Sequence, residues 1–259
     1  MRSFYRLVNY EFTRMFVPSL IICSISIVFT NILLLNSTAD SEYDPSLYKR
    51  FEHIYAESGS FILFFISFIA IITLFLVNFY KAYWGSKSIF TYLTLPIKRE
   101  ALYFAKLIVL IICLLMLLTS HLISIFIGYD LVTAKVAEIS NGKAIMNNGL
   151  FLAFIRSHHL RLLFPITWFG ILSSISLIIT VLTGFFYAAL CERSKRYWGL
   201  ALILVVFLFI FNVIQKYLNE IIYIGVETSS VVVTCTISFL VSVFFVWRSI
   251  RLIKKSAIS

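Results

Sequence analysis

Polar side chains are scarce in the long apolar stretches of this sequence, so the few that occur there are the first candidates for chemistry. His121 is the one histidine within such a stretch, and Asn31 and Asn78 are amides within two others. In a membrane, such groups either line a path for a polar solute or hydrogen-bond a neighbouring helix. All three are therefore candidate path-lining residues, and packing against a neighbouring helix is the alternative for each.

Motifs for metal binding or catalysis are few. His158 and His159 are adjacent, so their rings point to different faces of a helix, whereas metal ligands on a helix recur at three- or four-residue spacing. The run GSKS at 85–88 lacks the upstream glycine of a phosphate-binding loop, and HExxH and GxSxG do not occur. We therefore expect no metal site, no cofactor bound by this chain and no enzymatic activity of its own.

The elements that position these residues are hydrophobic runs about as long as a bilayer is thick. The chain has 259 residues, of which 61% are hydrophobic and 13% are charged, against about 25% charged in soluble proteins. A helix needs roughly 20 apolar residues to cross the hydrocarbon core. Six runs approach or exceed this length, at 17–36, 60–80, 107–128, 166–190, 199–215 and 231–247. They predict an all-α integral membrane protein with six transmembrane helices.

None of the six runs contains Asp or Glu. Carriers that couple transport to protons or ions usually place a carboxylate at membrane depth. The composition of the runs therefore argues against a secondary transporter.

The net charge of +10 is distributed by loop. The N-terminus, the second and fourth loops and the C-terminus together carry 15 basic and 3 acidic residues, while the other loops carry 7 basic and 9 acidic ones. The positive-inside rule then places both termini in the cytoplasm, which agrees with an even number of spans in the cell membrane. Topology and anionic headgroups account for this charge, so we expect the lipid bilayer and no nucleic acid as a partner.

The segments outside the runs also carry patterns. Residues 1–16 predict an amphipathic helix in the inner headgroup layer, with Phe4 and Phe12 on one face and Arg2 and Arg6 on the other. Pro18 is expected at the start of the first span, where its missing N–H costs little. Outside the membrane we expect a partly ordered acidic loop at 37–59, a long connection at 129–165 with an interfacial helix at 150–164, and a loop at 216–230.

The inner segment between the second and third runs is the most specific stretch. Gly85 breaks the outgoing helix, residues 86–93 can form two helical turns, and Pro96 starts a new helix with Arg99 in its first turn. Lys87 and Thr91 turn away from the apolar side of this short helix. That apolar side consists of Ile89, Phe90 and Leu93.

This segment resembles the inner loop of the permease subunits of ABC-2 type ABC transporters. In that family a Gly, a short apolar helix, a Leu-Pro pair, a basic residue and a later Lys join the second and third spans. The corresponding positions here are Gly85, 89–93, Leu95-Pro96, Arg99 and Lys106. The six spans and the N-terminal helix extend the resemblance to the whole chain, while the motif itself lies within residues 80–106. One departure is the run 81–84, Lys-Ala-Tyr-Trp, where many members carry an acidic residue.

The resemblance implies that residues 86–93 form a cytoplasmic coupling helix docked in a separate cytosolic ABC ATPase, which would bind ATP and Mg²⁺. The ATPase-coupling residues would be Gly85, Ser86, Ile89, Phe90, Leu93, Pro96 and Arg99. A second, smaller contact would come from Glu192, Arg193 and Lys195. A second permease copy or a paralogue would complete the translocation path.

The sequence thus predicts the permease subunit of an ATP-driven exporter. By family analogy, its substrate is an amphipathic peptide or a hydrophobic compound. The alternative is a stand-alone membrane binding or immunity protein that captures a ligand without transport. Function in that case would survive disruption of the inner helix.

Overall fold

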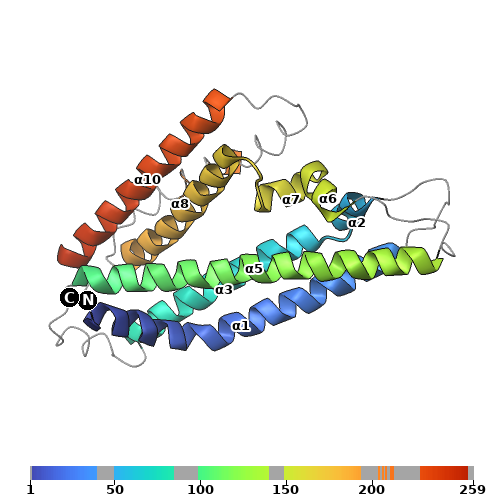
Figure 1. Cartoon of the computed structure of the whole chain (residues 1–259). Helices are drawn as coiled ribbons and strands as arrows, with labels where there is room; N and C mark the ends of the chain where they lie inside the picture. The colour runs from blue at the N-terminus through green and yellow to red at the C-terminus, as the bar shows by residue number, and fades with distance from the viewer. Residues whose placement is uncertain are drawn as a thin grey trace. The chain divides into compact units, whose positions relative to one another are not determined.

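The regular elements of this chain are helices. The computed structural model describes residues 2–39, 50–84, 99–139, 149–193, 204, 206, 208, 211–212 and 228–255, and no strand occurs among them (Figure 1). The helices are α1 Arg2–Ala39, α2 Phe51–Glu57, α3 Ser60–Trp84, α5 Arg99–Ile139, α6 Leu150–Arg156, α7 His158–Leu163, α8 Trp168–Arg193 and α10 Thr228–Lys255. The predicted all-α fold is therefore confirmed for the described part of the chain.

Five helices are long and apolar enough to cross a membrane. The candidate spans are Phe4–Thr38, Ser60–Lys81, Glu100–Glu138, Gly170–Glu192 and Val233–Ile253, in α1, α3, α5, α8 and α10. They overlap five of the six predicted runs. The remaining run, 199–215, lies outside the described residues except at 204, 206, 208 and 211–212, which are helical. Five such helices mark the chain as a multi-pass membrane protein.

The outer surfaces of these helices suit a lipid environment. On α3, Ile62, Ile66 and Ile69 are 63%, 58% and 61% exposed, and their spacing places them on one face. A stripe of large aliphatic side chains facing water would be unfavourable, whereas the same stripe facing acyl chains is not. The exposed apolar surface is therefore what a membrane-spanning helix requires.

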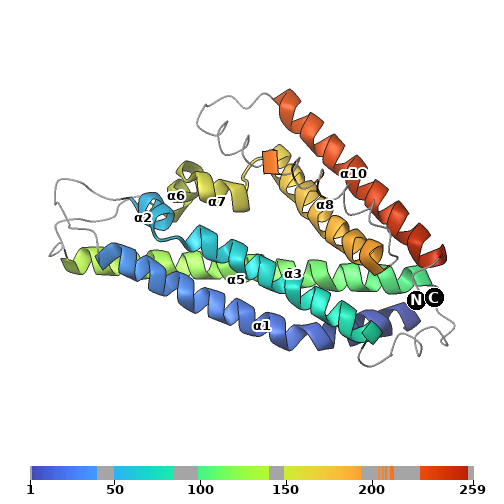
Figure 2. The same cartoon turned by 180° about the vertical axis from the view of Figure 1, so that it is seen from behind.

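The chain divides into two compact units. Unit 1 comprises Met1–Val8, Ser86–Ile108 and Leu162–Ser259, and unit 2 comprises Asn9–Gly85 and Val109–Arg161. In unit 1, α8 and α10 lie side by side (Figures 1 and 2). Thr180 Oγ1 donates a hydrogen bond across this pair to the carbonyl oxygen of Ser238 at 2.8 Å, and the Tyr187 and Phe245 rings stack at 5.3 Å. These contacts fasten the two helices together.

In unit 2, the parts of α1, α3 and α5 that belong to it pack side by side, as both views show (Figures 1 and 2). The short helix α2 contacts both α3 and α6. Apolar side chains fill the space between the long helices, and the fully buried ones include Leu34, Ile71, Leu117 and Ile125. Burial of these side chains supplies the packing that holds the three helices together.

Two predicted boundaries differ from the structure. The connection predicted to begin at residue 129 is helical as far as Ile139, because no helix breaker follows Gly128 and the apolar periodicity continues through Val132 and Val136, which are buried. The predicted interfacial helix at 150–164 is two helices, α6 and α7. Ser157 separates them in an extended conformation, and its Oγ accepts a hydrogen bond from the Leu160 N–H at 3.3 Å.

The N-terminal segment 1–16 is helical but not separate from the first span. Helix α1 runs without interruption from Arg2 to Ala39, so Pro18 lies inside a helix and not at its start. A proline there removes one backbone hydrogen bond, which membrane helices tolerate when neighbouring helices hold them. Whether the first turns of α1 lie in the headgroup layer stays a prediction.

Candidate functional site

The residues expected to couple the chain to an ATPase are largely outside the described ranges. Gly85, Ser86, Ile89, Phe90, Leu93 and Pro96 all fall between Trp84 and Arg99, and Lys195 follows the last residue of α8. Arg99 is the first residue of α5, while Glu192, an exposed side chain, and Arg193 are the last two residues of α8. The coupling assignments therefore stay predictions.

The candidate path-lining residues, in contrast, all lie in unit 2. His121 on α5 is fully buried, and its Nε2 is 2.9 Å from the hydroxyl oxygen of Tyr55 on α2. The other ring nitrogen, Nδ1, is also buried and has no hydrogen-bond partner. Buried polar atoms usually have partners, so this nitrogen is an unused hydrogen-bonding position inside the protein.

Tyr55 reaches His121 because of the turn that joins α2 to α3. Gly59 has φ of +73°, a left-handed conformation that other residues adopt with strain. Ser58 Oγ donates to the Tyr55 carbonyl oxygen at 2.9 Å and lies 2.7 Å from Ser60 Oγ. This turn folds α2 back so that Tyr55, which is completely buried, points toward α5. Burial raises the pKa of the Tyr55 phenol above its ordinary value.

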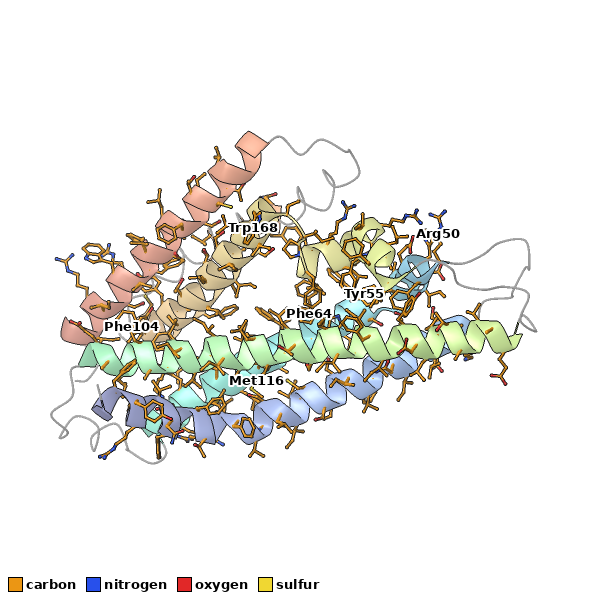
Figure 3. The ribbon with its side chains drawn as sticks, viewed as in Figure 1. Arg50, Tyr55, Phe64, Phe104, Met116 and Trp168 are labelled. Carbon is orange, nitrogen blue, oxygen red and sulfur yellow. The ribbon has the colours of Figure 1, made fainter. Side chains whose placement is uncertain are left out.

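Aromatic rings surround the Tyr55–His121 pair. The Phe64 ring of α3 lies 5.0 Å from the His121 ring, and Figure 3 shows Phe64 and Tyr55 close to α5. On α2, the Phe51 ring meets Tyr129 of α5 edge-on at 5.3 Å. These rings keep the pair in an apolar setting, which strengthens a hydrogen bond that is made and raises the cost of one that is not.

Asn31 makes the second polar contact between α1 and α5. Its Nδ2 donates to the Ile27 carbonyl oxygen at 2.8 Å and to Ser124 Oγ at 3.3 Å, while Oδ1 is buried without a partner. Gly128 permits this approach, because a Cβ there would lie 3.0 Å from Asn31 Oδ1 and 2.5 Å from Leu34 Cδ1. A glycine on α5 thus lets α1 and α5 pack closely around an amide.

The remaining candidates make contacts of a simpler kind. Asn78 on α3 donates from Nδ2 to the Met15 sulfur on α1 at 2.6 Å. The His159 ring on α7 lies 4.8 Å from the Phe61 ring. Among the described residues, no three His, Cys, Asp or Glu side chains come together to hold a metal ion. The polar groups of unit 2 therefore join helices pairwise, and two of them retain an unpaired buried atom.

Sequence reasoning identified His121 and Asn31 but missed the residues they contact. Tyr55 lies in a segment expected only to be partly ordered, although Phe51, Ile54, Tyr55 and Ser58 recur at helical spacing and are all buried. That periodicity was a usable signal for α2. Nothing in the sequence indicates which span Ser124 faces, since serine is common on both lipid-facing and buried surfaces of membrane helices.

Comparison with known proteins adds no relative to this geometry. No protein-family model, curated protein or solved structure matches the chain.

Proposed function

We propose that this chain is the membrane-spanning permease subunit of an ATP-driven exporter of the ABC-2 type. In this proposal it lies in the cell membrane with both termini in the cytoplasm. It works with a second permease copy or a paralogue and with separate cytosolic ATPase subunits. Its substrate is an amphipathic peptide or a hydrophobic compound.

The observation that carries the proposal is the segment at 85–106. A glycine, a short apolar helix, Leu95-Pro96, Arg99 and Lys106 follow one another between two membrane helices, α3 and α5. A segment that only connected two spans would need neither the apolar face at 89–93 nor the prolines and glycines that isolate it. An amphipathic helix between two spans has the form of a docking element for a soluble partner.

Helix α5 offers a way to transmit movement from that segment. It is continuous from Arg99 for 41 residues, which at 1.5 Å per residue is about 60 Å, twice the roughly 30 Å of the hydrocarbon core. A helix is stiff over this length, so a displacement applied near Arg99 reaches the residues beyond the membrane. Nucleotide-driven movement of an ATPase could therefore be felt along the entire helix.

The proposal is tested by purifying the tagged chain from its native membrane in mild detergent. We expect a cytosolic ATPase to co-purify. In the variant Phe90→Asp/Leu93→Asp, two charges replace the apolar side of the predicted coupling helix, so the ATPase should be lost. The matched control is Ser88→Asp/Thr91→Asp, which adds the same charge to the opposite side and should retain the ATPase.

Two results would contradict the proposal. Retention of the ATPase by Phe90→Asp/Leu93→Asp would show that residues 86–93 are not the docking element. Purification of the unchanged chain without any ATPase, in several detergents, would favour the stand-alone membrane binding or immunity protein.

A further inference from the structure

The C-terminal part of α10 carries a row of aromatic and cationic side chains. Phe244, Trp247, Arg248 and Arg251 are spaced by three, one and three residues, which places them on one face of the helix. The Arg248 guanidinium carbon lies 5.6 Å from the Phe244 ring centre and 5.8 Å from the Trp247 ring centre. The Arg251 guanidinium carbon lies 5.2 Å from the same Trp247 ring. Two guanidinium groups thus flank one indole.

The packing of α10 against α8 turns this row outward. Phe245 and Ser249, on the opposite side of the helix, are fully buried, and Phe245 stacks on Tyr187 of α8. Trp247 is 53% exposed, and both arginines are exposed. Helix α10 contains no Asp or Glu, so the row has no carboxylate on its own helix. Its positive charge is available to an anion from outside the helix.

The same face is apolar on its membrane side. Leu240 and Val243, one to two turns before Trp247, are 67% and 49% exposed. The order along the helix is therefore aliphatic, then aromatic, then cationic. A phospholipid has the same order, with acyl chains, an interfacial glycerol region and a phosphate. A free phosphate ion would use only the last part of it.

We propose that this face of α10, residues 240, 243, 244, 247, 248 and 251, binds one anionic phospholipid. Its phosphate lies between Arg248 and Arg251, and its acyl chains follow Leu240 and Val243. Guanidinium groups suit this role because they are weakly hydrated and bind phosphate oxygens through two parallel hydrogen bonds. Stacking on Trp247 holds both groups in place before the lipid arrives. The inference requires only that α10 crosses a bilayer, and it does not depend on transport.

The experiment is native mass spectrometry of the purified chain in detergent, titrated with phosphatidylglycerol or with phosphatidylcholine of the same acyl chains. We expect one phosphatidylglycerol to bind in preference to phosphatidylcholine. In Arg248→Gln/Arg251→Gln, its affinity should fall roughly 10- to 30-fold, as expected for the loss of two cationic contacts to an anionic headgroup. The matched control, Arg6→Gln/Arg14→Gln, removes the same charge from α1 and should bind as the unchanged chain does.

Further arms separate a lipid site from other causes. Inorganic phosphate in excess should not displace the lipid, because it lacks the acyl chains that Leu240 and Val243 contact. Trp247→Leu should weaken binding while keeping both charges. Circular dichroism and gel-filtration elution establish that each variant is folded, which exposed positions should allow. Equal binding of the two lipids, equal loss in both arginine variants, or displacement by phosphate would each overturn the proposal.

Discussion

Replacement of Gly128 by alanine tests whether α1 and α5 are as close as the structure places them. The new methyl group would lie 2.5 Å from Leu34 Cδ1 and 3.0 Å from Asn31 Oδ1. Carbon atoms in contact prefer about 3.5–4.0 Å, so the methyl carbon would be about 1 Å or more too close. Leu34 is fully buried and cannot turn aside into solvent.

The expected magnitude combines two opposing effects. Overpacking a filled core costs about 1–3 kcal/mol of unfolding free energy. Alanine is a better helix former than glycine by about 1 kcal/mol, which offsets part of that cost. Gly128→Ala should therefore lower stability by about 0–2 kcal/mol.

Gly184→Ala is the matched control, because Gly184 is also a helical glycine that faces a neighbouring helix. There the added methyl would meet Phe245 Cε2 at 3.4 Å, which is ordinary contact. Both variants gain the same helix propensity, so the difference between them isolates the overpacking. We expect Gly184→Ala to be more stable than Gly128→Ala by about 1–3 kcal/mol.

Thermal unfolding in a single detergent, followed by circular dichroism, measures this difference. At about 2–4 °C per kcal/mol, a gap of 2 kcal/mol corresponds to 4–8 °C in Tm. Trimming the obstructing side chain provides an internal check, because Gly128→Ala should no longer destabilise the chain in a Leu34→Ala background. Equal Tm values for the two glycine variants, or no rescue by Leu34→Ala, would refute the close packing of α1 and α5.

Two further predictions concern α2 and its turn. Tyr55→Phe removes the partner of His121 Nε2 and should cost about 1–3 kcal/mol, measured by unfolding at pH 7. Because burial raises the Tyr55 pKa, the unfolded chain loses the phenol proton first, so this difference should shrink above about pH 10, and a constant difference would contradict the buried phenol. Gly59→Ala should cost about 1–2 kcal/mol through its φ of +73°, although a Cβ there meets nothing within 4 Å. Gly59→Asn should cost less, because asparagine tolerates this conformation better, and equal Tm values for the two variants would argue against a strained turn.

Hydrophobic length was sufficient to predict the class of fold and the approximate position of five long helices. It could not predict where those helices stop. Nothing in the free energy of membrane insertion distinguishes Gly128, where the third run ends, from Ile139, where α5 ends. The extension depends on tertiary contacts, such as the hydrogen bond of 2.7 Å from Lys135 Nζ to the Leu35 carbonyl oxygen near the end of α1. Such a contact joins residues 100 positions apart and leaves no local pattern.

The candidate site was predictable to the same degree. A histidine and an amide in apolar runs stand out by composition alone, because each is costly there without a partner. The partners do not stand out, since Tyr55 belongs to a short helix outside the runs and Ser124 is one of many serines. Composition identifies the group that must be satisfied, and only the fold identifies what satisfies it.

The burial of those groups bears on where a substrate would pass. His121 is fully buried and Asn31 is 9% exposed, and both direct hydrogen bonds to other residues of unit 2. In this arrangement they tie helices together, which favours the packing interpretation over the path-lining one. The exposed faces of the described membrane helices are instead apolar, as on α3 at Ile62, Ile66 and Ile69. Under the proposed function, a path would then run along such a face and be closed by a second permease copy. A surface of this kind offers few hydrogen bonds and a large apolar area, so it would favour the lipid-like or amphipathic substrates proposed above over sugars or ions.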